Sequence, residues 1–469
     1  MAGGSLAVSG ATPAGASPTG ITVNCPTDNL QDAIFSAAAG STLLVSGTCT
    51  GNFYVDKNLN FLGPAILDGG GGPNQFGTTL NVASGTVVAT NLTIQDGVGI
   101  DNLGGGIWNG GQLTLNHSTV THNTAGAIGG VFNMGQLTLN SSTVSNNSAT
   151  NGEAGGIFNC GDNPGFQSFG LCTGAPASLT LNGSVVSNNV AGCCDGGGIW
   201  NDPQAVISLN LSTVSGNTAN GNGGGIANNG TATLNISKVS GNTAGTYGNG
   251  GGIENNGAAT LNFSTVSANT SGGNGGGIDN NGTATLNISN VSGNTTANNN
   301  GGGIENHGTT TLNASNLSGN SGGSGGGIEN NGTATLNASM VSNNASTGGS
   351  AFFAGGGGVS NGLSDTGPTT LNNCIIQANT AGFVGGGIFA GGGPMKINNS
   401  IVRGNSADAT GGGMIVWDGP TTVANSAFSK NSDPGVPILD TLPGVLVAPT
   451  NYLGFGNNPV FTTTHSTYS

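Results

Sequence analysis

Residues 223–242, GGGIANNGTATLNISKVSGN, form a unit whose close copies follow at 251–269, 275–294, 301–320 and 325–344. In its T-A-T-L-N-I segment, apolar residues alternate with Thr and Asn, which is the periodicity of a β-strand. A unit this short cannot bury its own Ile, Leu and Val, but it can do so by stacking on identical neighbours. The repeat therefore predicts an all-β parallel solenoid with one unit per coil and with glycines at tight corners.

Looser copies run from Gly104 to Asn431 and give twelve units of mostly 24 to 31 residues. We divide the chain into a flexible or partner-docked segment (1–20), an N-terminal cap with the first coils (21–103), the repeat helix (104–432, with an insertion at 160–178) and a C-terminal cap or tail (433–469).

Upstream of the repeats, TDNLQDAIFSAAAG at 27–40 is the one segment with a helical pattern. Thr27 or Asp28 is a candidate N-cap, Leu30, Ala33, Ile34 and Ala37 make one apolar face, and Gly40 is a stop signal. We expect this short helix to cap the first coil.

Two asparagine positions recur once per unit. The first closes the V-S-G-N element in all twelve units: Asn123, Asn147, Asn189, Asn217, Asn242, Asn269, Asn294, Asn320, Asn344, Asn379, Asn405 and Asn431. The second follows Leu or, once, Ile in eleven units, as at Asn116, Asn235, Asn287 and Asn372, and Ala424 is the exception. Identical amides stacked about 4.8 Å apart can hydrogen-bond from coil to coil. Both columns predict asparagine ladders.

The composition excludes several classes of function. The 469 residues include 5 Lys+Arg against 19 Asp+Glu, a net charge of −14, and 93 Gly. Five basic residues cannot neutralise a phosphate backbone, which excludes nucleic acid as a main partner. With 35% hydrophobic residues and no long apolar run, no membrane-spanning helix is expected.

The seven cysteines favour disulfides in an oxidising compartment. Cys25 and Cys49 flank the helical segment, and four others surround the insertion: Cys160, Cys172, Cys193 and Cys194. No C-x-x-C pair is present, so a zinc site is disfavoured. We expect at least two disulfides, of unspecified connectivity, with one thiol left over and Cys374 isolated. An extracellular or cell-surface location follows.

The G-G-G-I-x-N and V-S-G-N elements resemble the right-handed parallel β-helix of the pectate-lyase-like superfamily. Within it they are similar to the polymorphic outer-membrane-protein type of repeat. The resemblance covers roughly residues 21–432. It implies a fold rather than an activity, because that superfamily includes lyases, hydrolases, adhesins and inert stalks.

An enzyme is not the leading interpretation. The Asn-Thr-Asp, Asp-Asp, Gly-His-Gly and Arg-Ile-Lys elements of polygalacturonases are missing from the sequence. Its five basic residues lie beside no acidic cluster in sequence, and no nucleophile constellation can be assembled. We predict no catalytic residues and no cofactor. A carbohydrate-active enzyme of unrecognised type stays as the third hypothesis, with an acid pair hidden in the acidic column described next.

One column of residues combines aromatic and acidic side chains. The residue after the apolar position of G-G-G-I is, unit by unit, Trp108, Phe132, Phe158, Trp200, Ala227, Glu254, Asp279, Glu305, Glu329, Ser360, Phe389 and Ile415. We expect this column to face outward. The functional interpretation is a cation or sugar site, since carboxylates bind Ca²⁺ and aromatic faces stack on sugar rings. The alternative is that loops cover the aromatic residues while the acids are solvated.

A second outward face carries threonines at one position of most units, from Thr114 to Thr422. In four units a second Thr precedes it by two residues, giving the pairs Thr231/Thr233, Thr283/Thr285, Thr309/Thr311 and Thr333/Thr335. This array resembles the ice-binding face of β-solenoid antifreeze proteins, although Ala258 interrupts it. Threonine is also a common exposed strand residue.

The leading hypothesis is a secreted, non-enzymatic β-helix that acts as an extracellular structural or adhesive rod. About 15 coils at ~4.8 Å each would reach ~70 Å. Its expected partners are copies of itself or cell-surface components, and head-to-tail fibres would form if the terminal segments dock on neighbouring rods. The second hypothesis is a module that binds polysaccharide or ice through the aromatic/acidic or the Thr-rich face.

Overall fold

The structure is a computed structural model. It describes residues 20–70, 77–99, 104–161, 172, 175–348, 355–362, 367–417, 419–433, 445–447, 461–464 and 466–468. The predicted N-terminal segment lies outside the described residues except for Gly20, and so does most of the insertion.

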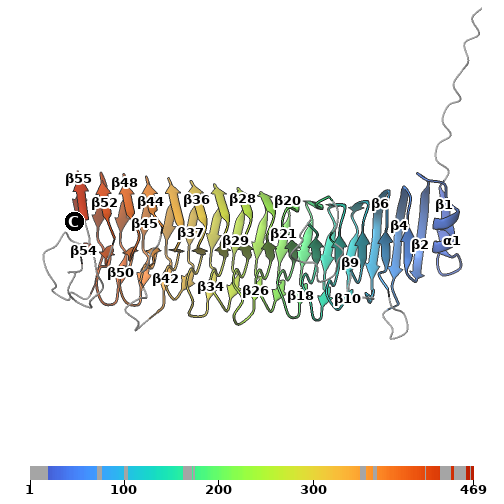
Figure 1. The fold of residues 1–469 in the computed structure, drawn as a ribbon, viewed down its shortest axis with the longest axis horizontal. Coiled ribbons are helices and arrows are strands. Elements are labelled where there is room, and N and C mark those ends of the chain that lie inside the picture. Colours follow the sequence, from blue (N-terminus) through green and yellow to red (C-terminus); the bar gives the residue numbers. More distant parts are fainter. Residues whose placement is uncertain are drawn as a thin grey trace, which may run out of the picture.

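The described chain is a parallel β-helix, as the repeat predicts (Figure 1). A central coil consists of β23 (Ile226–Asn228), β24 (Thr231–Asn235), β25 (Lys238–Ser240) and β26 (Thr243–Ala244). Equivalent strands of successive coils pair in parallel and form sheets of 30, 15 and 11 strands. Strands β24 and β25 belong to the 30-stranded sheet, β23 to the 15-stranded sheet and β26 to the 11-stranded sheet.

The core is a stack of aliphatic side chains, one set per coil. Ile226, Leu234 and Val239 are at most 1% exposed, and their equivalents in the next coils pair with them in register. Glycines form the corner before β23. Gly223 has φ of +60°, and a Cβ on Gly224 would lie 2.4 Å from the carbonyl carbon of Thr243.

Both predicted asparagine ladders are present. In the buried ladder, Asn217 donates from Nδ2 to Asn242 Oδ1 at 3.0 Å, and this pattern continues from Asn123 to Asn431. In the half-buried ladder, Asn235 Nδ2 donates to Asn210 Oδ1 at 3.0 Å. A third ladder, which we did not predict, uses the Asn of G-G-G-I-x-N: Asn228 Nδ2 donates to Asn255 Oδ1 at 2.7 Å.

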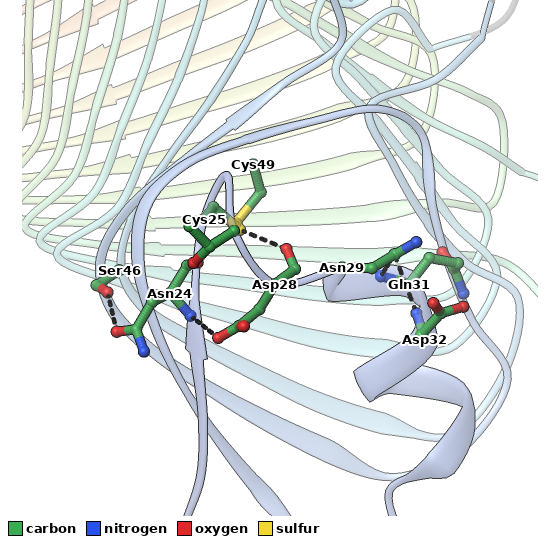
Figure 2. Close-up of a disulfide and its surroundings, with 9 residues drawn as sticks. Asn24, Cys25, Asp28, Asn29, Gln31, Asp32, Ser46 and Cys49 are labelled. Atoms are coloured by element: carbon green, nitrogen blue, oxygen red, sulfur yellow. Dashed lines mark hydrogen bonds between the residues drawn. A yellow bond between two sulfur atoms is a disulfide. The ribbon is translucent and has the colours of Figure 1, made fainter.

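The helix α1 (Leu30–Ser36) lies at the N-terminal end against β1 (Ile21–Asn24), β2 (Thr42–Thr50) and β3 (Phe53–Val55) (Figure 1). It is shorter than the predicted 27–40. Its N-cap is Asn29, because Asn29 Oδ1 accepts hydrogen bonds from the Gln31 and Asp32 N–H groups, so the prediction of Thr27 or Asp28 was wrong (Figure 2). The apolar face is as expected, with Leu30 and Ile34 fully buried.

Three disulfides join Cys25 to Cys49, Cys160 to Cys172, and Cys193 to Cys194. Figure 2 shows the first of them beside the α1 cap. Cys374 is a buried free thiol, as expected. The described residues contain no helix long and apolar enough to cross a membrane.

The described strands near the C-terminus pair with the last repeat coil. Here β54 (Val445–Val447) pairs with β51 (Met414–Val416), β55 (Phe461–Thr464) with β52 (Thr421–Ala424), and β56 (Thr467–Tyr468) with β53 (Ala427–Ser429). These described strands therefore extend the two sheets of the rod by one further strand at each of their three positions.

Candidate functional site

The aromatic and acidic column lies on consecutive strands of the 15-stranded sheet. These strands are β7 (Ile107–Asn109), β11 (Val131–Asn133), β15 (Ile157–Asn159), β19 (Ile199–Asn201), β23, β27 (Ile253–Asn255), β31 (Ile278–Asn280), β35 (Ile304–Asn306) and β39 (Ile328–Asn330). Their parallel register places Trp108, Phe132, Phe158 and Trp200 in one line, followed after Ala227 by Glu254, Asp279, Glu305 and Glu329. The predicted column therefore exists.

Its expected exposure was wrong. Glu254, Asp279, Glu305 and Glu329, which we call the acid column, are only 6%, 2%, 1% and 4% exposed. The alternative interpretation, in which these acids are solvated, is therefore also wrong. Phe132, Phe158 and Trp200 are buried as well, and Trp108 alone of the four aromatic residues is half-buried.

Each acid is covered because the corner glycine folds the chain back over it. The left-handed Gly325 lies so close to Glu329 that a Cβ there would be 2.7 Å from the Cβ of Glu329. The corner loops are themselves stacked by hydrogen bonds: the N–H groups of Asn249, Asn274 and Asn300 donate to the side-chain Oδ1 of Asn222, Asn249 and Asn274. The sequence does not predict this cover of corner loops. The alternation of apolar and polar residues identifies which side chains point away from the core, but not what covers them.

Several carboxylate oxygens of the acid column accept no hydrogen bond. Asn256 donates to Glu254 Oε1 at 3.1 Å, Asn281 to Asp279 Oδ2 at 3.2 Å, and Asn331 to Glu305 Oε1 at 2.8 Å. The other oxygens, Glu254 Oε2, Asp279 Oδ1 and Glu305 Oε2, are buried and accept no hydrogen bond. A buried ionised carboxylate with an unpartnered oxygen is costly, which favours the neutral acid.

The pKa values of the acid column move accordingly. Burial raises the pKa of Glu254 to about 7, and the charge of Asp195 adds to the effect. Burial raises the pKa of Glu329 to about 6, against the hydrogen bonds from Ser360 and Ser324. The pKa of Glu305 is raised well above its ordinary range by burial and then by Glu329 and Asp279.

One histidine lies beside this column. His307 Nε2 is 3.5 Å from Glu305 Oε1 and its Nδ1 is 4.0 Å from Asp279 Oδ1. Burial raises the pKa of Asp279, and the charge of His307 opposes that rise. His307 occupies the turn position that Asn256, Asn281 and Asn331 occupy in neighbouring coils.

The four acids lie in a line along the rod axis, one on each successive strand, and do not converge on one point. Among the described residues, the one group of three potential metal ligands with close donor atoms is Cys160, Cys172 and Asp202. Its two sulfurs are joined in a disulfide, so they are not thiolate ligands. Neither place offers the preformed ring of oxygen ligands that Ca²⁺ takes.

The aromatic half of the column is mainly a packing cluster. The ring centroids of Phe132 and Phe158 are 5.6 Å apart, and those of Phe158 and Trp200 are 6.1 Å apart. Trp200 Nε1 donates to Asp202 Oδ1 at 3.0 Å. These three rings have little surface left for a sugar, so the predicted four-residue sugar platform reduces to Trp108.

Trp108 lines an open groove of about 590 Å³ at the corner between the 15- and 30-stranded sheets. Gly85, Gly111 and Gly135 lie along it, and Gln112 and Gln136 line it with exposed side chains from consecutive coils. Sequence reasoning missed both glutamines. A signal was present, since only these two units have Gln at the position where later units have Thr or another residue.

The threonine face is built as predicted in its register. Thr233, Thr260, Thr285, Thr311 and Thr335 pair in one continuous row on β24, β28 (Ala258–Asn262), β32 (Thr283–Asn287), β36 (Thr309–Asn313) and β40 (Thr333–Asn337). Thr231, Thr283, Thr309 and Thr333 form a second row, which Ala258 interrupts. All of these threonines are exposed or half-buried.

Comparison with models of known protein families, with curated proteins and with solved structures finds no match to this chain. The likeness to pectate-lyase-like helices and to outer-membrane-protein repeats therefore remains a prediction from sequence motifs.

Proposed function

We propose that this chain is a secreted, non-enzymatic β-helix that acts as an extracellular structural or adhesive rod. The observation that carries the proposal is the unbroken stack of coils, in which one buried asparagine ladder runs from Asn123 to Asn431. Such a ladder ties each coil to the next and makes a long, stiff body. The buried acid column supports the same proposal, because a glycan-cleaving acid pair must reach its substrate.

The disulfides support an oxidising compartment, in which such bonds persist. Cys25–Cys49 links the end of β1 to β2 and so cross-links the first coil of the rod.

Fractionation of the producing cells, combined with a glycan-cleavage screen, tests this function. We expect the chain in the surface-attached or extracellular fraction, and no release of reducing ends from acidic or neutral glycans. Multiple-turnover cleavage of any glycan, abolished by Glu305→Gln, would replace the rod with the enzyme hypothesis.

The groove at Trp108 favours a second candidate function, the binding of a neutral polysaccharide. A half-exposed indole beside two amide side chains matches the chemistry of sugar rings, whose faces are apolar and whose edges are hydroxyls. The glycines leave the groove open along the rod. A linear chain could therefore lie in it across consecutive coils.

Retention on insoluble neutral polysaccharides tests the groove. Trp108→Ala is expected to abolish retention, and Tyr247→Ala is the control, since Tyr247 is an exposed aromatic residue (92%) outside the groove. Equal retention of the wild type and of Trp108→Ala would remove the groove as the binding site. Ice binding by the Thr face is a separate prediction, tested by thermal hysteresis.

A further inference from the structure

One corner of the rod exposes large apolar side chains. This corner is the residue directly after the half-buried asparagine ladder, for example between β24 and β25, and its φ is positive in every repeat coil. In four consecutive coils it is Leu211, Ile236, Phe263 and Ile288, which are 66%, 60%, 59% and 55% exposed. We call these four residues the apolar ridge.

Hydrogen bonds between coils hold the ridge in line. The N–H groups of Leu211, Ile236 and Phe263 donate to the carbonyl oxygens of Asn235, Asn262 and Asn287, each in the next coil, at 2.9 to 3.0 Å. The four side chains therefore recur at the spacing of adjacent strands, about 4.8 Å.

The fold alone gives no reason for these residues. Their φ angles of 50° to 53° belong to the left-handed region, which disfavours bulky and β-branched side chains and favours Gly and Asn. Other coils place suitable residues there: Gly183, Asn373, Asn399 and Asn425. The ridge thus combines backbone strain with exposed apolar surface. Such a combination is typical of binding sites.

The ridge also lies in a part of the rod with almost no exposed charge. Between Val206 and Ser342, the only acids are the four buried residues of the acid column, and Lys238 is the only Lys or Arg. The outward neighbours of the ridge are mainly Thr, Ser and Asn. Two chains of net charge −14 repel each other in general, but they can approach on this side without bringing carboxylates together.

We propose that the apolar ridge is the contact through which two copies of this chain associate side by side. A second copy has the same side-chain spacing, so the four apolar residues of one rod fit between those of the other. The contact uses the same patch on both copies, which is the commonest arrangement in protein dimers. The flanking Thr and Asn rows supply a polar rim. This inference rests on the proposed function as a structural rod, since it names a partner of that rod.

Replacing all four ridge residues by Asn tests the contact. The variant L211N/I236N/F263N/I288N is expected to fold with an equal or higher melting temperature, because Asn already occupies this corner at Asn373, Asn399 and Asn425. The purified wild-type chain is expected to show a mass that rises to that of a dimer over about a hundredfold range of concentration in light scattering. The variant is expected to stay monomeric over the same range.

The coils that follow the apolar ridge offer a matched control. Ala314→Asn/Ala338→Asn changes the same corner in the next two coils without removing a large apolar side chain, and should associate as the wild type does. A monomeric wild type at every concentration, or a ridge variant that associates as strongly as the control, overturns the inference. If the wild type is monomeric at every concentration but is still found on the cell surface, the side-by-side contact is overturned and the proposed function stands.

Discussion

At the scale of single residues, the acid column is the most unusual feature of the molecule. Four carboxyl groups stack on adjacent coils and are covered by the corner loops. These four coils, residues 250–345, contain no Lys or Arg. Two carboxylates on neighbouring strands repel each other, and burial strengthens that repulsion. Protonated carboxyl groups do not repel one another in this way, so the folded rod favours the protonated form of these acids.

Stability is therefore expected to fall as the pH rises. Glu254 has a folded pKa of about 7 against 4.5 for the ordinary group, so the folded chain holds more protons than the unfolded chain between these values. The stabilisation is fully present below pH 4.5 and is lost as the pH rises through 7. For Glu254 alone the change is on the order of 3 kcal/mol. Thermal unfolding between pH 4.5 and 8 measures it.

The double variant Glu254→Gln/Glu305→Gln should flatten this pH dependence and raise the melting temperature at pH 8, because the amide resembles the neutral acid. Asp408→Asn is the control, since Asp408 is exposed. A melting temperature that rises from pH 4.5 to 8 in the wild type would contradict the assignment of buried neutral acids.

The identity of these residues could be predicted from the sequence, but their environment could not. The repeat placed Glu254, Asp279, Glu305 and Glu329 in one line, and the pairing of their strands confirms it. Their burial depends on the fold-back at left-handed glycines such as Gly325, which is a tertiary feature. The groove at Trp108 was missed for the same reason, because it forms between two sheets.

At the scale of elements, the ladders explain why a chain with 93 glycines is ordered. Each buried Asn satisfies backbone groups at a corner as well as its neighbour: Asn242 donates to Val214 O and to Asn269 Oδ1, and its Oδ1 accepts from the N–H and Nδ2 of Asn217. The V-S-G-N and L-N columns were predictable because they repeat. The third ladder escaped prediction, although its Asn recurs in ten of the twelve units, with Ala390 and Val416 as the exceptions.

Asn242→Ala is expected to destabilise the rod by about 3 kcal/mol or more, because it leaves several buried polar groups unpartnered. Asn235→Ala, in the half-buried ladder, is the matched comparison, and its cost should be about 1 kcal/mol since water can replace the lost amide. Chemical denaturation measures both. Equal losses in the free energy of unfolding would show that the buried ladder stabilises the rod no more than the half-buried ladder does.

The helix boundary illustrates the limit of local signals. Thr27, Asp28 and Asn29 are all acceptable N-caps, and the choice of Asn29 follows from where the chain leaves β1. Asn29→Ala should cost about 1 kcal/mol, measured as the free energy of unfolding of the N-terminal end by hydrogen exchange. Thr27→Ala provides the comparison, and a larger effect there would contradict the assigned cap.

At the scale of the whole molecule, the rod is a stack of interchangeable coils. Deletion of residues 276–301 removes one coil and joins Gly275 to Gly302, so that a left-handed glycine again precedes the strand (φ +62° and +64° at Gly275 and Gly301). The shortened chain is expected to fold and to be shorter by about 4.8 Å in X-ray scattering. Deletion of 276–288, half a coil, breaks the register and should prevent folding of the downstream coils. Normal folding of both deletions would contradict the one-unit coil.

The central claim, an extracellular structural or adhesive rod, is tested most directly by electron microscopy of the native protein on the cells that make it, located with gold-labelled antibody. The account predicts label on straight rods attached to the cell surface, with about 70 Å contributed by each chain. Label confined to the interior of the cells, or label outside them on compact particles that are not rods, would contradict it.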